Sequence, residues 1–186
     1  MRVFVAINIT QAVRSRISVA VKPLREAGFP IRWIADENVH LTLKFLGGVP
    51  EERVEDVCLA VDAAAEGVSS FVMNLKGFGV FPSPRRPSVF WVGVDLDPTL
   101  AGLQGRTEDA LAKLGYPRED RRFHPHLTLG RARKKARPSE FEGLAEAIEW
   151  LEYNDESCVE TLDVMRSVLM PTGAVYDIIH SVKLLS

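Results

Sequence analysis

The four residues His-Leu-Thr-Leu occur twice in this chain, at residues 40–43 and 126–129, although the chain holds only four histidines. The copies lie 126 − 40 = 86 positions apart, close to half of the 186 residues. Leucine alternates with a polar residue and threonine is β-branched, a pattern typical of a half-buried strand. Histidine and threonine then share one face, and the leucines enter the core. Two halves that face each other would bring two imidazoles and two hydroxyls into one cleft.

The rest of the chain alternates predicted strands and helices. The predicted strands cover residues 2–8, 31–34, 39–46, 71–75, 89–94, 126–129, 157–169 and 174–184. The predicted helices cover residues 10–26, 50–67, 97–114 and 138–147, the first capped by Thr10 and shortened by Pro23. A similar order of strands and helices appears in both halves of the chain, and the predicted strand Phe90–Val94 is the first element of the second half. We therefore predict an α+β, bilobal fold of two related lobes, each with an antiparallel sheet and helices, about a pseudo-twofold axis.

Length and composition fit one soluble domain covering residues 1–186, in which the two lobes are intertwined. The chain is 46% hydrophobic and 26% charged, and no apolar run approaches the roughly 18 residues that cross a bilayer. The first residues resemble a core strand more than a signal peptide, so we expect a cytoplasmic protein. Cys58 and Cys158 are expected to fill the core and not to act as nucleophiles or ligands.

Basic residues gather around the second His-Leu-Thr-Leu copy. The net charge of the chain is −2, but residues 118–137 hold eight of the 23 lysines and arginines against two acidic residues. Such a run is usually a solvated surface; beside a candidate site it favours an anionic substrate.

Two histidines facing one substrate suit concerted acid–base chemistry, because imidazole titrates near neutrality. In-line displacement at phosphorus needs a base on one side and an acid on the other, and the opening of a 2′,3′-cyclic phosphate fits this requirement. His40 and His126 are the candidate acid and base, although identical copies do not assign the two roles. Thr42 and Thr128 would donate hydrogen bonds to the non-bridging phosphate oxygens.

Two cations near the motifs are candidate phosphate ligands. Lys44 follows His40 by four residues, and strand alternation places it on the face of His40 and Thr42. Arg131 follows His126 by five residues and falls on the opposite face, so its participation requires a bulge or twist near Gly130.

Other uses of these residues have weaker support. His124 has no counterpart in the first copy and is read as supporting or structural, and His180 as structural. No His-Glu-x-x-His or Cys-x-x-Cys motif predicts a metal site. Neither a Gly-x-Ser-x-Gly elbow nor a phosphate-binding P-loop occurs, so serine hydrolase chemistry and a requirement for ATP are not predicted.

The paired motifs resemble those of the 2H phosphoesterase superfamily, in particular its RNA 2′,3′-cyclic phosphodiesterases, also described as 2′-5′ RNA ligase-like. The similarity covers nearly the whole chain, from Arg2–Ile7 through Gly77–Gly79 to Ser167–Leu169. It implies a bilobal fold with a central cleft, hydrolysis to a 2′-phosphate without metal or other cofactor, His40 as proton donor and His126 as proton acceptor. It also places Arg131 at the position of a phosphate-contacting arginine.

Several functions remain open at this point. The leading hypothesis is hydrolysis of RNA ending in a 2′,3′-cyclic phosphate, with tRNA fragments among the candidate substrates, by a monomer that binds no membrane. The reverse 2′-5′ ligation is expected to be minor in water. The alternatives are a phosphodiesterase acting on small cyclic nucleotides or ADP-ribose cyclic phosphate, and a non-catalytic RNA-binding module.

Overall fold

The computed structural model describes residues 1–170 and 173–186. Its strands are β1 (Arg2–Asn8), β2 (Ile31–Trp33), β3 (His40–Gly48), β4 (Phe71–Phe81), β5 (Val89–Val94), β6 (His126–Ala132), β7 (Asn154–Val159), β8 (Thr161–Met170) and β9 (Gly173–Lys183). Its α-helices are α1 (Gln11–Ala20), α2 (Lys22–Glu26), α3 (Val54–Ala65), α4 (Pro98–Ala112) and α5 (Leu144–Glu149). Short 3₁₀ turns η1 (Asp36–Asn38), η2 (Glu51–Arg53) and η3 (Pro138–Phe141) lie between them.

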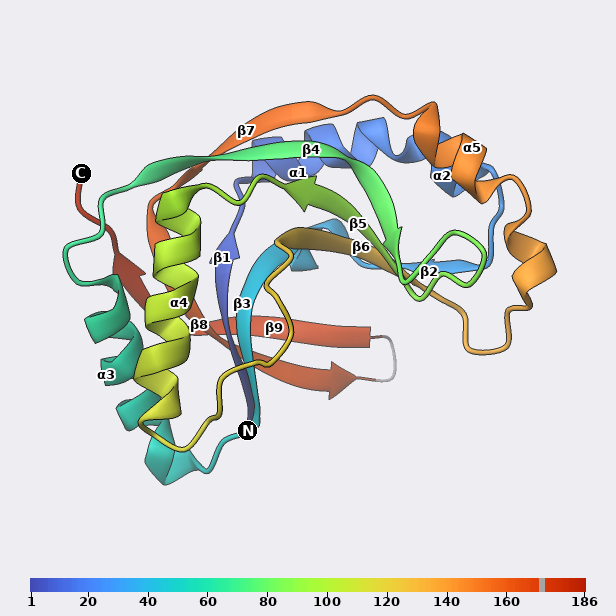
Figure 1. Cartoon of the computed structure of the whole chain (residues 1–186). Helices are drawn as coiled ribbons and strands as arrows, with labels where there is room; N and C mark the ends of the chain where they lie inside the picture. The colour runs from blue at the N-terminus through green and yellow to red at the C-terminus, as the bar shows by residue number, and fades with distance from the viewer. Residues whose placement is uncertain (171–172) are drawn as a thin grey trace.

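In the described residues, nine strands form one curled sheet in the order β7-β4-β5-β6-β3-β1-β8-β9, with β2 paired to β6. All pairs between these strands are antiparallel. The two motif strands β3 and β6 are neighbours at the centre, where Leu41 pairs with Leu127. The sheet therefore has two halves, each carrying one motif, as predicted for a bilobal α+β fold. In Figure 1, β4, β5 and β6 arch above the β8–β9 hairpin, and α3 lies beside α4.

One buried apolar cluster contains side chains from both halves of the sheet. Val5, Leu41 and Leu162 come from the half with β3, and Phe90 and Leu127 from the half with β6. All five are at most 2% exposed. Burial of this kind stabilises by roughly 25 cal/mol per Å² of apolar area, so the shared cluster fixes the two motif strands relative to each other.

The starts of α1 and α4 follow the sequence prediction. The Thr10 hydroxyl accepts a hydrogen bond from the Val13 amide at 3.3 Å and caps α1. The predicted helix 10–26 is interrupted at Val21, and Pro23 lies in the first turn of α2, where its missing amide costs little. The Asp97 carboxylate caps α4 by accepting from two backbone amides.

Several predicted elements had wrong bounds, among them the helix predicted over residues 50–67, which is the 3₁₀ turn η2 followed by α3. The strand predicted over residues 157–169 is two strands, because β7 pairs with β4 in one half and β8 with β1 in the other, and the chain changes halves at Glu160. The strand predicted over 71–75 continues to Phe81 through a bulge, with Gly77 at φ 63°. The helix predicted over 138–147 is a 3₁₀ turn followed by α5.

None of the helices in the described residues is long and apolar enough to cross a membrane.

Candidate active site

The geometry of the candidate site follows from the pairing of the two motif strands. Leu41 and Leu127 pair across β3 and β6 and are 1% and 0% exposed, so both point into the core. Side chains alternate along a strand, which directs the histidine and threonine of each copy to the opposite face. In antiparallel register about this pair, His40 comes opposite Thr128. Thr42 comes opposite His126, so the four polar side chains form one two-by-two patch.

His40 is half-buried among aromatic rings. Its ring stacks on Phe4 with centroids 4.9 Å apart and an interplanar angle of 28°, and it meets Tyr176 edge-on at 5.2 Å. Its Nδ1 lies 2.8 Å from the Asn38 carbonyl oxygen, and its Nε2 lies 3.1 Å from the Thr42 hydroxyl. The ring is therefore held on both nitrogens and on both sides.

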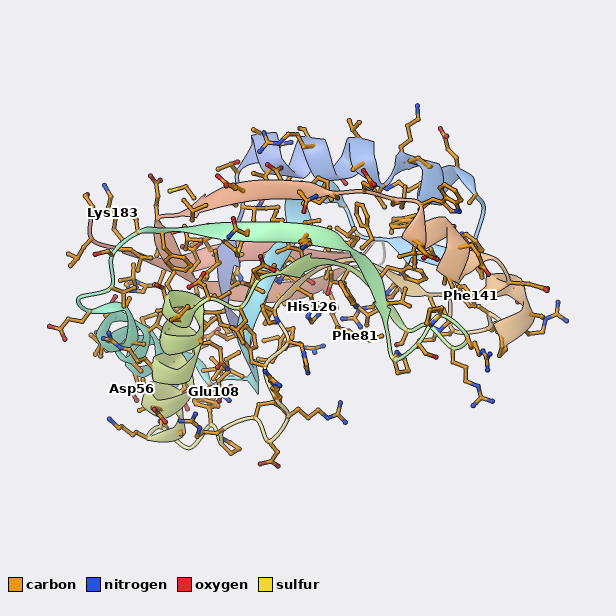
Figure 2. All side chains as sticks on the ribbon, turned by 45° about the horizontal axis from the view of Figure 1, so that its top comes forward. Asp56, Phe81, Glu108, His126, Phe141 and Lys183 are labelled. Atoms are coloured by element: carbon orange, nitrogen blue, oxygen red, sulfur yellow. The ribbon has the colours of Figure 1, made fainter. Side chains whose placement is uncertain are left out.

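His126 has a matching environment built from different residues. Its Nδ1 lies 2.7 Å from the His124 carbonyl oxygen. Its ring meets Phe81 edge-on at 5.1 Å and is tilted against Trp91 at 6.5 Å. Figure 2 labels His126 and Phe81, which lie side by side under the arch of β4 and β5.

The two histidines share one hydrogen-bond pattern. In each, Nδ1 faces the backbone carbonyl two residues earlier in the chain. A carbonyl oxygen only accepts, so Nδ1 of each ring carries the hydrogen and donates it. This bond fixes the tautomer and leaves Nε2 as the nitrogen that exchanges a proton with a substrate. In His40 this Nε2 faces the Thr42 hydroxyl, so a substrate would have to displace that contact.

Burial lowers the pKa of both imidazoles. The pKa of His40 is lowered to about 4, mainly because burial disfavours its charged form, and the positive charge of Arg14 adds to this effect. The pKa of His126 is also lowered, first by burial and then by the charges of Arg131 and His124. In both cases the hydrogen bond to the backbone carbonyl acts in the opposite direction. Both rings are therefore neutral near pH 7 in the free protein.

Matched irregularities follow each motif. Val5 pairs with Lys44 while Ala6 pairs with Thr42, so Leu43 is an extra residue of β3. Phe90 pairs with Gly130 while Trp91 pairs with Thr128, so Leu129 is an extra residue of β6. Each bulge reverses the alternation that follows it.

The bulge in β6 brings Arg131 to the motif face. The burial pattern is the same in both strands, and the residue five positions after each histidine is exposed, Phe45 in β3 and Arg131 in β6. The ring of Phe45 meets Phe4, which stacks on His40. Arg131 is close enough to His126 to lower its pKa. The bulge that the sequence argument required for Arg131 is thus present, at Leu129.

The prediction that Lys44 shares the face of His40 is wrong. Lys44 is 7% exposed, and its Nζ donates to Glu108 Oε2 of α4 at 2.6 Å and to the Pro117 carbonyl at 2.7 Å. The β3 bulge turns this side chain to the helix side of the sheet. Lys44 is therefore a buried structural cation and does not line the patch that holds Thr42.

The sequence argument missed the side chains that hold the two rings. Phe4 belongs to β1, whose Asn8 lies opposite His40, and Tyr176 comes from β9. Trp91 lies opposite Thr128 on β5. The alternation of β1 and β5 could have placed Phe4 and Trp91 on one face, but no sequence signal brings Tyr176 to His40.

A pocket of about 400 Å³ opens beside His126. Phe81, Trp91 and Phe123 supply its aromatic walls, and the exposed residues Lys76 and Arg122 add positive charge. The basic stretch of residues 118–137 therefore contributes to this pocket through Arg122, in the segment that leads into β6.

The remaining candidates have other surroundings. His124 is exposed and supports His126 through its backbone carbonyl. His180 Nε2 lies 2.7 Å from Asp62 Oδ1 of α3, on the helix side of the sheet, which confirms the structural interpretation.

Cys58 packs partly against the core, whereas Cys158 is exposed on β7, so the core prediction is wrong for Cys158. Over residues 1–170 and 173–186, no three His, Cys, Asp or Glu side chains are grouped to hold a metal ion.

The chain matches a known protein family over most of its length. The family model described as LigT like Phosphoesterase matches the chain twice, over residues 7–91 and 93–176. These segments begin 93 − 7 = 86 positions apart, which is also the spacing of the two histidines. The chain belongs to the LigT-like family of 2H phosphoesterases. The resemblance inferred from the paired motifs is thereby confirmed.

Relatives match along almost the full chain. An RNA 2′,3′-cyclic phosphodiesterase of Thermotoga maritima is 34% identical over 97% of this chain and 94% of its own length. One from Methanothermobacter thermautotrophicus is 32% identical over 95% of each chain. The crystal structure of TT0787 of Thermus thermophilus superimposes with a TM-score of 0.83 at 26% identity, covering 99% of this chain and 98% of that one.

Proposed function

We propose that this protein hydrolyses RNA ends that carry a 2′,3′-cyclic phosphate to 2′-phosphate ends by two-histidine acid–base catalysis. The observation that carries the proposal is the mirrored pair of imidazoles on adjacent strands, each with Nδ1 bound to a backbone carbonyl. Diagonal neighbours on adjacent strands are about 7–8 Å apart, which suits two groups that bracket one phosphate. The names of the relatives support the same substrate class.

In the proposed reaction a water molecule attacks phosphorus from the side of His126. The His126 Nε2 accepts the proton of the water, and protonated His40 Nε2 donates a proton to the departing ribose O3′. The P–O3′ bond breaks as the new P–O bond forms, and O2′ keeps the phosphate. His40 is neutral in the free protein, so it must take up its proton with the anionic substrate.

The other polar residues stabilise the phosphate in this proposal. The hydroxyls of Thr42 and Thr128 donate hydrogen bonds to the non-bridging oxygens, Thr42 after releasing the Nε2 atom of His40. Arg131 adds a charge that does not titrate near neutral pH. No step requires a metal ion or another cofactor.

Exposed arginines around the second motif suit a polyanion. Arg121, Arg122, Arg131 and Arg133 are all exposed, in β6 and in the segments on either side of it. We propose that a monomer binds RNA through this surface, with tRNA fragments among the candidate substrates. The 2′-5′ ligation of a 5′-hydroxyl would be the same displacement with the hydroxyl in place of water, and it is minor in water.

The test is a defined oligonucleotide with a 2′,3′-cyclic phosphate end, incubated with the protein in EDTA. We expect a 2′-phosphate product, and turnover lowered roughly 10²–10⁴-fold in His40→Ala and in His126→Ala. His180→Ala is the matched control, since His180 pairs with Asp62 on the helix side. Activity that disappears in EDTA and returns with zinc, or a control variant as inactive as the other two, would reject the mechanism.

A further inference from the structure

The pocket beside His126 lies on one side of the proposed reaction centre only. Its lining includes His126, and among the described residues it includes no member of the first motif. The pocket therefore extends from the reacting phosphate toward the side of the proposed base, away from His40.

Its walls suit a flat, aromatic ligand. Phe81 and Trp91 pack against each other with centroids 5.0 Å apart and an interplanar angle of 37°. A Cβ built on Gly79 would come within 2.2 Å of the Trp91 ring, so the indole lies directly against the glycine backbone and has little freedom to move. Phe123 adds a third ring from the segment before β6. Rings held in this way offer platforms on which any of the nucleobases can stack.

The charges at the pocket suit the backbone of a nucleic acid. Lys76 and Arg122 line it and are exposed, and one carboxylate, Asp95, accompanies them. An aromatic wall combined with two cations is the composition of a site for a nucleotide, with phosphates near the cations and the base against the rings.

The geometry of in-line displacement decides whether a nucleotide in this pocket carries the attacking or the departing oxygen. The attacking oxygen and the departing oxygen lie on opposite sides of phosphorus, and the proposed base stands beside the attacking one. A group bound next to His126 therefore carries the attacking oxygen. In hydrolysis that oxygen belongs to water. A water molecule does not stack on aromatic rings, so hydrolysis does not explain the aromatic walls.

We propose that this pocket is an acceptor subsite that binds a nucleoside whose 5′-hydroxyl replaces water as the nucleophile. The proposal rests on the proposed function and on its assignment of His126 as the base. The O5′–H proton goes to His126 Nε2, the new P–O5′ bond forms, the P–O3′ bond breaks and O3′ receives the proton of His40. The product is a 2′-5′ phosphodiester with a free 3′-hydroxyl, and no further reactant is needed.

Partitioning between water and an acceptor tests the subsite. Cytidine 2′,3′-cyclic phosphate is incubated with increasing adenosine, and cytidine 2′-phosphate and the 2′-5′ dinucleoside monophosphate are quantified together. We expect the dinucleoside yield to saturate with adenosine in the wild type. In Phe123→Leu, which keeps an apolar side chain but removes the ring, the transfer efficiency should fall about tenfold while hydrolysis without adenosine stays within about twofold.

A second variant probes the charge of the same pocket. Arg122→Gln replaces an exposed side chain and leaves the core untouched. With the dinucleotide ApA as acceptor, the wild type should transfer more efficiently than with adenosine, and Arg122→Gln should lose that advantage.

The possible outcomes separate the two proposals. Hydrolysis and transfer that fall by the same factor in Phe123→Leu would overturn the acceptor assignment, because the pocket would then hold the cyclic nucleotide itself. Wild-type hydrolysis without saturable transfer, or transfer that neither variant changes, would overturn it too. A wild type that produces neither compound would reject the proposed function and the inference with it.

Discussion

His40 combines a low pKa with the proposed role of proton donor. Burial against Phe4 and Tyr176 lowers its pKa to about 4, so the ring is neutral in the free protein at pH 7. A phosphate bound beside it supplies the negative charge that the aromatic surroundings lack, which raises the pKa in the complex. The proton then arrives together with the substrate, and the free protein does not keep a buried charge without a partner.

This argument predicts proton uptake on anion binding. Because the complex binds a proton more tightly than the free protein, affinity for a 2′-phosphate nucleotide should rise as pH falls from about 8 toward 5. Calorimetry in buffers of different ionisation enthalpy should show close to one proton taken up near pH 6. His40→Asn should lose most of this uptake. Affinity that does not change with pH would contradict the argument.

Arg131 should affect catalysis in a different way from the histidines. Arg131→Ala should lower kcat/KM roughly 10²-fold by removing a charge-assisted contact to phosphate, and Arg131→Lys should restore only part of it. The bell-shaped dependence of kcat on pH, which reflects the substrate complex, should keep both limbs. Its acidic limb should move to higher pH, because the positive charge of Arg131 lowers the pKa of His126. Steady-state kinetics from pH 4 to 9 measure both effects, and unchanged kinetics would exclude the phosphate contact.

The sequence predicted the site residues unevenly, for physical reasons. The repeated motif marked His40 and His126 as candidates because a duplicated pattern of two polar residues on one strand face is unusual. The alternation argument failed at Lys44 because it assumes a regular ladder, and a bulge at Leu43 reverses the faces. The contact with Tyr176 depends on β9 folding back onto β8, a tertiary arrangement that no local pattern encodes.

At the scale of elements, the buried pair of Lys44 and Glu108 joins β3, α4 and the segment before β6. Glu108 Oε2 accepts from Lys44 Nζ at 2.6 Å and from the Glu119 amide at 3.2 Å. Lys44 also donates to the Pro117 carbonyl. The segment that continues to Phe123 and the pocket is thus anchored to the first motif strand by one ion pair.

Breaking this pair should destabilise the fold. Lys44→Met leaves the Glu108 carboxylate buried without its cation, which should lower the free energy of unfolding by about 3–5 kcal/mol. Lys44→Met combined with Glu108→Leu should recover part of this loss, because no unpaired charge remains. Urea denaturation measures both variants. Strictly additive losses in the double variant would show that the two residues do not act as a pair.

Element types followed from local sequence better than element ends did. Caps at Thr10 and Asp97 are local hydrogen bonds, so the sequence predicted where α1 and α4 begin. The extension of β4 through Gly77 and the division at Glu160 depend on which strand lies alongside. A partner strand from the other end of the chain is a tertiary fact, and local propensity does not report it.

At the scale of the whole molecule, the two halves are not two consecutive pieces of chain. β1 and β3 lie near the N-terminus, but β8 and β9, which complete their half of the sheet, are the last strands of the protein. β7 returns to pair with β4 in the other half. A cut between the two motifs would therefore leave each half without strands that bury its core.

This arrangement predicts one cooperative unfolding transition. Leu127→Ala and Val164→Ala each remove a fully buried side chain, one from each half, and should lower the free energy of unfolding by about 2–5 and about 1–3 kcal/mol respectively. Trp33 and Trp91 both pack in the half that contains β6, and Trp150 follows α5, which packs against β4 in the same half, so fluorescence reports mainly on that half. Far-UV circular dichroism reports on the whole sheet.

Urea titrations followed by the two signals should coincide in the wild type and in both variants. Val164→Ala distinguishes one cooperative transition from two separate ones, because its cavity lies in the half that the tryptophans do not probe. If the halves unfold together, this variant must shift the fluorescence midpoint as far as the dichroism midpoint. A fluorescence midpoint that stays at the wild-type value while the dichroism curve divides would show two independent lobes. The shared core of Leu41 and Leu127 would then be too weak to couple them.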